Sequence, residues 1–480
     1  MKYYLWVIGC QYNEWDGARL RHSLDSLGLQ ESSDKEADVI VIVACSVRQT
    51  AVDRIFGHVK NWNHNTDHNN TDLNTDNPKT SKNKNSNGII EQLNNGKLIL
   101  ITGCVLDTDK KKFTEKGIQF FNSGDFETLK KMIVCHSEPF SFVQGKLREE
   151  SDICVIPSEV EGSSYGKILR FTQDDSPKNL TPNNLKNYPP NACSYVPIMI
   201  GCNNFCSYCA VPYVRGRERS RSMEEIIADV KSIIKYHSSQ KGDLPAGKAG
   251  SYSMDFSADK PASKSKIEII LLGQNVNSYS ITDRSVIPHL MRNPLIVPAC
   301  RQGRDSRRSL SRALTRGGND KHEISDFTRL LMILNNLDGD FKIGFISNHP
   351  KDMSNDIIEA VATLPKIKKQ IHLPLQSGSD KILKAMNRPY TTKQYLQIVK
   401  NLKFKIQNLK LTTDVIVGFP GESKADFQKT VKIMKKVNFK QAYINKYSPR
   451  VGTAAFKLGD PIPWSEKQRR WRVLNNIANK

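Results

Sequence analysis

The sequence predicts an α/β protein in two parts, an N-terminal parallel-sheet α/β domain followed by a partial (β/α)6 barrel. Two observations predict this fold class. Short apolar runs alternate with helical patterns, which is typical of parallel sheets covered by helices. Cysteines and small polar residues come directly after several of these runs, and α/β proteins gather their ligand sites at the carboxyl ends of strands. The 480 residues are enough for both parts.

Residues 1–135 are predicted to form the N-terminal domain. Its expected elements are a strand at Tyr3–Ile8, a helix at Asn13–Leu27, a buried strand at Val39–Ala44 and another strand at Leu98–Thr102. Residues 62–95 are rich in Asn, Thr, Asp and Lys, which is too polar a mixture to bury a core, and indicate an insert. Residues 136–188 carry Pro, Ser and Asn and are interpreted as a linker or insert.

Residues 189–455 are predicted to form the barrel. Its strands are expected at Tyr195–Ile200, Ile267–Leu272, Phe341–Ile346, Gln370–Leu375, Leu411–Val417 and Ala442–Tyr447. Helices are expected between them, at Met223–Tyr236, Asp356–Leu364, Thr392–Phe404 and Ala425–Val437. Six strands that alternate with helices indicate a partial parallel barrel, whose working face lies at the strand carboxyl ends. Two inserts, at about 238–265 and 281–320, interrupt the pattern, and residues 456–480 are expected to be a C-terminal tail.

The composition favours a polyanionic partner inside the cell. Lys and Arg number 71 against 49 Asp and Glu, and the net charge of +22 favours nucleic acid, although a generic basic surface gives the same total. The arginine-rich run at 301–318 could contact RNA, but a solvated insert is the simpler interpretation. No run approaches the roughly 20 apolar residues that span a bilayer, so we expect a cytoplasmic protein with no membrane partner. Ten cysteines in a reducing compartment then favour metal or redox chemistry.

Three closely spaced cysteines form the sharpest local signal. Cys202, Cys206 and Cys209 lie in GCNNFCSYC, just after the first expected barrel strand. Soft thiolates select iron–sulfur clusters, zinc or copper(I), so the spacing alone leaves the metal open. A structural zinc site usually has four ligands, and no fourth cysteine or histidine follows nearby. Three ligands would instead leave one iron of a 4Fe–4S cluster open to a cofactor.

A second set of cysteines follows strands of the first domain. Cys10, Cys45 and Cys104 each come directly after one of its expected strands, where parallel sheets gather ligands. Three unrelated buried cysteines are the alternative. The remaining cysteines have no such context and are given no role, because cysteine often behaves as a small hydrophobe; they are Cys135, Cys154, Cys193 and Cys300.

The cysteine loop and several other blocks resemble a known family. CNNFCSYC has the CxxxCxxC pattern of radical S-adenosylmethionine (radical SAM) enzymes, and its continuation AVPYVRGRERSRS resembles the methylthiotransferase branch. The further matching blocks are GCQYNEWD (9–16), ACSVRQTA (44–51), TGCV (102–105), LLGQNVNSY (271–279), SNHPKDM (347–353), HLPLQSGSDKILKAMNRPYT (372–391), LTTDVIVGFPGE (411–422) and YSPRVGTAA (447–455). The first block looks most like synthases of the MiaB type, which act on tRNA dimethylallyladenosine.

The resemblance implies a ligand set and a reaction. Cys202, Cys206 and Cys209 would be the catalytic ligands of a radical-generating 4Fe–4S cluster, and Cys10, Cys45 and Cys104 would hold an auxiliary 4Fe–4S cluster. Gln274 and Asn275 would contact S-adenosyl-L-methionine. The reaction would add a methylthio group at C2 of N6-isopentenyladenosine next to the anticodon. The implied partners are the anticodon stem-loop of tRNA, an electron donor such as flavodoxin or ferredoxin, and a possible sulfur donor.

Other readings stay open at this point. The same branch contains enzymes that act on threonylcarbamoyladenosine in tRNA or on a ribosomal-protein aspartate, and a non-catalytic iron–sulfur RNA-binding protein is a further alternative. Most family members continue into a small TRAM-like β-barrel domain, which is predicted to be absent here. Gly418–Glu422 is expected to turn the chain into a helix, with Glu422 at the helix N-terminus. Four alternating arginines could meet phosphates, the cofactor carboxylate or only solvent; they are Arg215, Arg217, Arg219 and Arg221.

Overall fold

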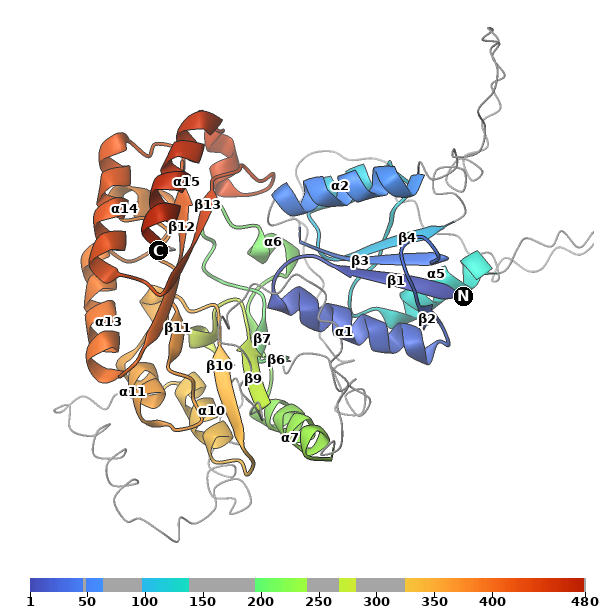
Figure 1. The fold of residues 1–480 in the computed structure, drawn as a ribbon, viewed down its shortest axis with the longest axis horizontal. Helices are drawn as coiled ribbons and strands as arrows, with labels where there is room; N and C mark the ends of the chain where they lie inside the picture. The colour runs from blue at the N-terminus through green and yellow to red at the C-terminus, as the bar shows by residue number, and fades with distance from the viewer. Residues whose placement is uncertain (46–48, 64–96, 138–194, 240–266, 282–323, 479–480) are drawn as a thin grey trace, which may run out of the picture. The chain divides into compact units, whose positions relative to one another are not determined.

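The computed structural model describes residues 1–45, 49–63, 97–137, 195–239, 267–281 and 324–478 (Figure 1). These residues fall into two compact units, the first within residues 1–188 and the second mainly from Pro189 onward. The predicted inserts at 62–95, 238–265 and 281–320 and the linker at 136–188 lie almost entirely outside the described residues. In the ranges given above, no helix is both long enough and apolar enough to cross a bilayer.

The first unit is built on a five-stranded parallel sheet. Its strands are β1 (Lys2–Val7), β2 (Gln30–Glu31), β3 (Val39–Cys45), β4 (Leu98–Cys104) and β5 (Gln119–Phe120), in the order β2-β1-β3-β4-β5. Its helices are α1 (Gln11–Ser26), α2 (Gln49–Asn63), α4 (Asp107–Thr114) and α5 (Phe126–Ser137). The N-terminal parallel-sheet α/β domain is therefore confirmed.

The central strand β3 is buried on both faces, because alternate side chains meet different helices. Ile40 and Ile42 belong to the cluster that contains Val52 of α2, whereas Val41 belongs to the cluster that contains Leu24 of α1. Figure 1 shows α1 and α2 on opposite faces of this sheet. A continuous β-branched run with no polar residue is what a strand covered on both sides requires. This explains why the predicted strand at Val39–Ala44 agrees closely with β3.

The second unit has six parallel strands that follow one another in chain order. They are β6 (Tyr195–Pro197), β9 (Ile267–Leu272), β10 (Phe341–Phe345), β11 (Gln370–His372), β12 (Lys410–Val417) and β13 (Gln441–Lys446). They form two sheets, β10-β9-β6 and β11-β12-β13, and a parallel bridge between Ile343 and Ile367 links β10 to the segment just before β11. The strand order is the one that a parallel barrel requires.

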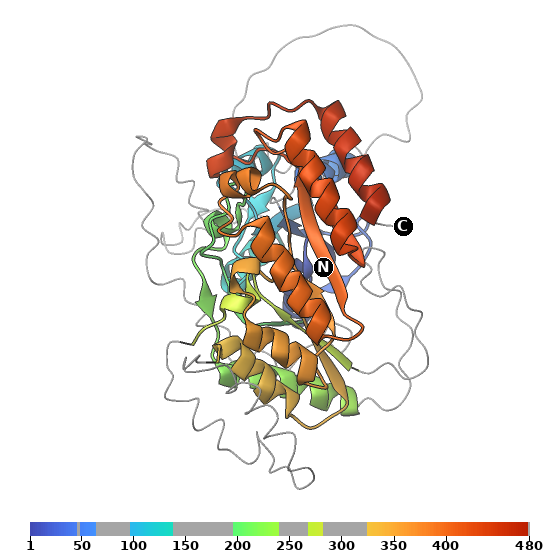
Figure 2. The same ribbon diagram turned by 90° about the vertical axis from the view of Figure 1, so that its left-hand side faces the viewer.

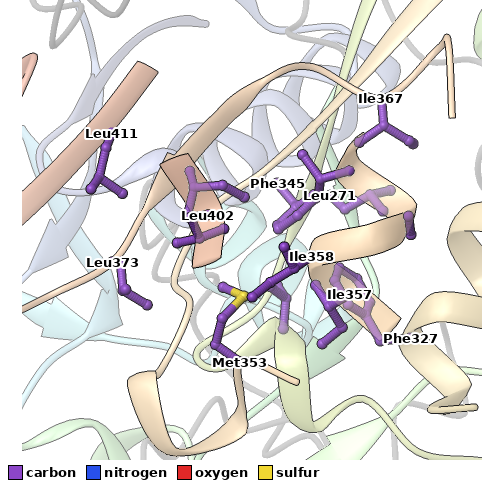
Figure 3. Close-up of a cluster of buried hydrophobic side chains, with 14 of the residues drawn as sticks. Leu271, Phe327, Phe345, Met353, Ile357, Ile358, Ile367, Leu373, Leu402 and Leu411 are labelled. Carbon is purple, nitrogen blue, oxygen red and sulfur yellow. The ribbon is translucent and has the colours of Figure 1, made fainter. Parts of the chain in front are cut away.

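Helices cover one side of these strands, and the apolar core lies between the two layers. They are α7 (Met223–Ser239), α10 (Asp326–Asn335), α11 (Asn355–Thr363), α12 (Asp380–Ala385), α13 (Thr392–Lys405) and α14 (Lys424–Val437). Figure 2 views this layer from its outer side. Figure 3 shows Leu271 and Phe345 of the strands among Phe327, Ile358 and Leu402 of the helices, and all five side chains are buried.

Two of the expected barrel strands are shorter than predicted. The run Tyr195–Ile200 splits into β6 and β7 (Met199–Ile200), because β9 ends opposite Pro197 and the chain beyond it pairs antiparallel with β8 (Arg219–Ser220). The run Gln370–Leu375 is a strand only to His372, because Pro374 has no N–H to donate to a ladder. Both corrections shorten the strands at their carboxyl ends, where the candidate site lies.

The residues expected to be a tail are an integral part of the second unit. Residues Ala454–Leu458 form the 3-10 helix η5, and Trp464–Ala478 form α15. Leu474 of α15 is fully buried in the same core cluster as the strands, and the Trp471 indole N–H donates to the carbonyl of Ile444 in β13 at 2.9 Å. The apolar face of α15 therefore packs against the core and β13, which its sequence alone did not reveal.

Candidate functional site

A tight loop between β7 and α6 (Val211–Val214) carries the three cysteines of the CxxxCxxC motif. The loop begins with Gly201 at φ +77°, where a Cβ atom would lie 2.1 Å from the carbonyl oxygen of Arg217, so only glycine fits. The Cys202 N–H donates to the carbonyl of Gly216 at 3.2 Å, and the Cys209 N–H donates to that of Cys206 at 2.9 Å. The backbone thus holds the three cysteines on one short, fixed turn.

The thiols of this loop lie in poorly hydrated surroundings. Cys202 and Cys206 are buried and Cys209 is half-buried. Burial raises the pKa of Cys209 to about 12, and the neighbouring charge of Cys206 adds to the shift. Burial also raises the pKa of Cys202, against a backbone hydrogen bond at Asn204. Three such thiolates need a strong cationic partner to stay deprotonated together, which is what iron supplies.

A buried arginine in the segment that follows α12 contacts the cysteine loop. Arg388 is 7% exposed, and its Nη1 donates to Cys206 Sγ at 3.5 Å. Its other nitrogens donate to the hydroxyl of Tyr390 at 3.0 Å and to the carbonyl of Pro374 at 3.3 Å. Within the described parts of the chain, no carboxylate lies within 4 Å of this guanidinium. A buried cation needs an anion, and the thiolate side of the loop is the anionic group it contacts.

A group of buried polar atoms without partners lies at the ends of β9, β10 and β11. In the described residues, each member of this group has one side-chain nitrogen or oxygen that makes no hydrogen bond. An unsatisfied buried polar atom costs about 1–3 kcal/mol, so several together point to a bound polar ligand. The members are Asn275 Oδ1, Asn277 Nδ2, Asn348 Oδ1, His349 Nε2 and Gln376 Oε1.

Backbone strain gathers at the same strand ends. Among the described residues, the non-glycine residues at positive φ are three asparagines, which tolerate this conformation, together with Phe205, Ser347 and Gln376. Phe205 lies in the cysteine loop, Ser347 precedes Asn348, and Gln376 is itself one of the partnerless residues. Strained residues of this kind persist where a ligand site requires them.

Gln274 and Asn275, the residues predicted to contact the cofactor, lie just after the end of β9. Asn275 is buried next to η3 (Val276–Ser278), where its Nδ2 donates to Asp352 Oδ2 at 2.7 Å and its Oδ1 has no partner in the described protein. Gln274 is half-buried beside it. Of the predicted basic residues, Arg221 is not solvated, because it is buried and paired with Asp229 at 2.8 Å.

Two of the three cysteines of the second set lie at the end of the first unit's sheet. Cys45 and Cys104 are buried and face each other as register partners in β3 and β4. Gly103 before Cys104 has φ +96°, and a Cβ there would come within 2.6 Å of the Ala44 carbonyl oxygen, so the two strands approach closely at this point. Cys10 is exposed and follows β1 in the chain after Gly9.

The thiols of neither set converge on one point. In the described ranges, no three His, Cys, Asp or Glu side chains are arranged to hold a single metal ion. Each iron of a 4Fe–4S cluster takes its own cysteine, so cluster ligands stand apart and need not meet. The donor type, the burial and the buried arginine therefore fit a cluster better than a mononuclear metal site.

Comparisons with known proteins assign this pair of units to a family. Residues 305–434 match the Radical SAM superfamily, and residues 2–121 match the Uncharacterized protein family UPF0004. A tRNA-2-methylthio-N(6)-dimethylallyladenosine synthase from Clostridium botulinum is 32% identical over 480 residues, which cover 100% of this chain and 82% of the relative. The chain belongs to this family of synthases, the MiaB-type radical SAM methylthiotransferases. It is therefore an enzyme that uses S-adenosylmethionine and 4Fe–4S clusters.

A second sequence relative agrees with this assignment. The synthase of Carboxydothermus hydrogenoformans is 30% identical over 99% of this chain and 83% of its own length. Among solved structures, the radical S-adenosylmethionine methyltransferase TsrM from Kitasatospora setae has a TM-score of 0.47 and 10% identity, covering 95% of this chain and 74% of that one. The family assignment therefore rests on the sequence relatives. The expected absence of a TRAM-like domain stays a prediction.

Sequence reasoning missed several residues that the structure brings to the site. Arg388, Asn348, His349 and Gln376 all stand inside blocks that match the family, but their types alone suggest only surface or capping roles. The local signal was the polar residues that directly follow apolar strands in SNHP and LQS. Burial and the missing partners became visible only in three dimensions.

Proposed function

We propose that this chain adds a methylthio group at C2 of N6-isopentenyladenosine next to the anticodon of tRNA. One observation carries the proposal: the similarity to synthases of this name extends over the whole chain, at 30–32% identity. The two cysteine sets on two α/β units support it, because the reaction needs one centre to generate a radical and one to hold sulfur. The net charge of +22 suits a polyanionic substrate.

In this proposal Cys202, Cys206 and Cys209 hold the cluster at which S-adenosylmethionine binds, on a partial (β/α)6 barrel. When bound, the cluster and S-adenosylmethionine supply a 5′-deoxyadenosyl radical able to remove hydrogen from an unreactive carbon. The protein itself controls the surroundings of the cluster. Its loop buries the thiolates, Arg388 donates an N–H to Cys206 Sγ, and the strand ends exclude bulk water from the reacting groups.

The polar strand ends would hold the cofactor. Gln274 and Asn275 would contact S-adenosylmethionine, and the partnerless atoms of Asn277, Asn348 and Gln376 offer further donors and acceptors to a zwitterionic ligand. Cys10, Cys45 and Cys104 would hold the auxiliary cluster. An electron donor such as flavodoxin or ferredoxin and a sulfur donor complete the partners that we propose beside tRNA.

Nucleoside mass spectrometry tests this function. Transfer RNA that bears isopentenyladenosine is incubated anaerobically with reconstituted protein, reductant and S-adenosylmethionine, then digested. We expect the 2-methylthio nucleoside, and tRNA without the isopentenyl group serves as the control substrate. Formation of 5′-deoxyadenosine without any modified nucleoside would contradict the substrate, whereas the absence of both products would contradict the enzymatic assignment.

Removing the second cysteine set gives a quantitative prediction. The double variant Cys45→Ser/Cys104→Ser is expected to reduce bound iron from about eight to about four atoms per chain, because each 4Fe–4S cluster carries four. Cleavage of S-adenosylmethionine should persist, since the loop cysteines are intact, while the methylthio product should disappear. Iron and sulfide assays after reconstitution measure this, with Cys300→Ser as the control. Iron that stays near eight in the double variant would rule out these two residues as ligands.

A further inference from the structure

Resting on the proposed function, we propose that His349 is a positioning residue that donates its Nε2–H to the carboxylate of S-adenosylmethionine. His349 lies just after β10 and before the 3-10 helix η4 (Pro350–Asp352), among the partnerless polar atoms described above. The ring is 4% exposed, so its polar atoms cannot be satisfied by bulk solvent. Its role depends on which ring nitrogen carries the proton and on which ligand atom can accept a hydrogen bond from it.

The tautomer of His349 follows from a local hydrogen bond. The backbone N–H of Lys351 donates to His349 Nδ1 at 3.2 Å, which makes Nδ1 an acceptor. A neutral imidazole with Nδ1 as acceptor carries its proton on Nε2. Burial lowers the pKa of His349 to about 2, with the charges of Arg388 and Lys351 adding to the effect, so the ring is neutral at physiological pH. Nε2–H is therefore a buried donor with no acceptor among the described residues.

Two further contacts hold the ring in place. The backbone N–H of His349 donates to Asn277 Oδ1 at 3.0 Å, which ties the segment to the end of β9. The ring also meets that of Tyr390 edge-on, with centroids 5.8 Å apart. The Tyr390 hydroxyl in turn accepts from Arg388 Nε at 3.0 Å, and Arg388 reaches Cys206 Sγ. His349 is thus fixed in a continuous line of contacts that begins at the cysteine loop.

The charge near His349 indicates which group of S-adenosylmethionine its Nε2–H contacts. Arg388 contacts Cys206 Sγ and has no carboxylate partner among the described residues, so a buried guanidinium lies close enough to His349 for its charge to act on the ring. S-adenosylmethionine has one anionic group, its carboxylate, while its amino and sulfonium groups are cationic. A neutral N–H beside a buried cation favours an anionic acceptor over either of these. The carboxylate is therefore the group that His349 Nε2–H suits best.

Ligand binding by the reconstituted protein tests this inference without any tRNA. The change His349→Leu keeps a side chain of similar bulk but replaces the polar ring by an apolar group and so removes the donor. We expect it to weaken S-adenosylmethionine binding by about 10- to 100-fold, the range for a hydrogen bond to a charged group. Equilibrium dialysis measures the affinity, and the shift that S-adenosylmethionine causes in the electron paramagnetic resonance spectrum of the reduced cluster gives a second readout.

Binding of a ligand that lacks the carboxylate shows whether His349 positions that group or only supports the fold. Binding of 5′-methylthioadenosine, which lacks the whole amino-acid part, should change less than about threefold in His349→Leu. The variant His349→Gln, which keeps an amide donor, should recover part of the affinity for S-adenosylmethionine. His237→Leu, at the far end of α7, serves as the control and should bind both ligands like the parent protein.

Two results would overturn the inference. Unchanged S-adenosylmethionine affinity in His349→Leu would show that the donor is not used, and an equal loss for both ligands would show that the residue only supports the fold. If His349→Leu fails to take up iron, the comparison of the two ligands in His349→Gln decides instead. A parent protein that binds S-adenosylmethionine through His349 but never modifies tRNA would refute the proposed function and leave this inference standing.

Discussion

Replacing Cys206 by alanine is expected to abolish the formation of 5′-deoxyadenosine from S-adenosylmethionine. The change removes one of the three loop thiolates and, in the proposed ligand set, leaves an iron of the cluster without its ligand. It also leaves the guanidinium of Arg388 buried without the sulfur that accepts its N–H at 3.5 Å. Both effects act against cluster assembly, so the loss should be complete within detection and not a partial reduction in rate.

Quantitative mass spectrometry of the nucleoside products checks this result. Reconstituted protein, reductant and S-adenosylmethionine suffice, because the cleavage step needs no tRNA. Cys300→Ala is the matched control, since it removes a thiol to which the sequence gives no role. The iron content of Cys206→Ala should fall by about four atoms per chain if the whole cluster is lost. Sustained production of 5′-deoxyadenosine would show that Cys206 is not a ligand.

The largest expected effect on stability comes from α15. Arg470→Met should lower the free energy of unfolding by about 3–5 kcal/mol, the usual cost of breaking a buried ion pair from one side. Arg470 Nη1 donates to Glu422 Oε2 at 2.6 Å, and both side chains are almost fully buried. Burial already raises the pKa of Glu422, so without Arg470 its carboxylate must either stay charged in a site that disfavours charge or take up a proton.

The neighbouring arginine provides the control for this prediction. Arg469 pairs with Glu466, but its side chain is about half exposed, so Arg469→Met should cost less than about 1 kcal/mol. The double variant Glu422→Gln/Arg470→Met should recover part of the loss, because it removes the stranded carboxylate. Urea unfolding followed by tryptophan fluorescence compares the midpoints. Equal midpoints for Arg469→Met and Arg470→Met would contradict a special role for the buried pair.

The turn before α14 contains a feature that the local sequence does not determine. Glu422 was expected at the helix N-terminus, but Ser423 and Asp426 form the capping box there. Glu422 instead points to Arg470 and accepts the N–H of Gly418 at 2.7 Å. An acidic residue just before a helix can either interact with the helix N-terminus or pair with a distant cation, and the local sequence is the same in both cases. Only the position of α15, which the sequence suggested was a tail, decides between them.

The sequence by itself determined those features that depend on neighbours along the chain. The all-apolar run of β3 requires cover on both faces, and the spacing of Cys202, Cys206 and Cys209 allows three thiolates on one turn. These signals are local, because strand periodicity and loop reach are set within a few residues. The α/β fold class, the parallel sheet of the first unit and the main strands could therefore be predicted without coordinates.

Only the tertiary structure decided which polar side chains are buried and what they contact. Arg388 and Cys206 are 182 residues apart in the chain, and the tautomer of His349 is visible only once its contact with Lys351 N–H and its burial are known. Desolvation and long-range pairing depend on how distant strands and helices come together, and residue type does not encode them. Polar side chains that look solvent-exposed in the sequence are buried in the second unit, at the strand ends where we propose that the ligand binds.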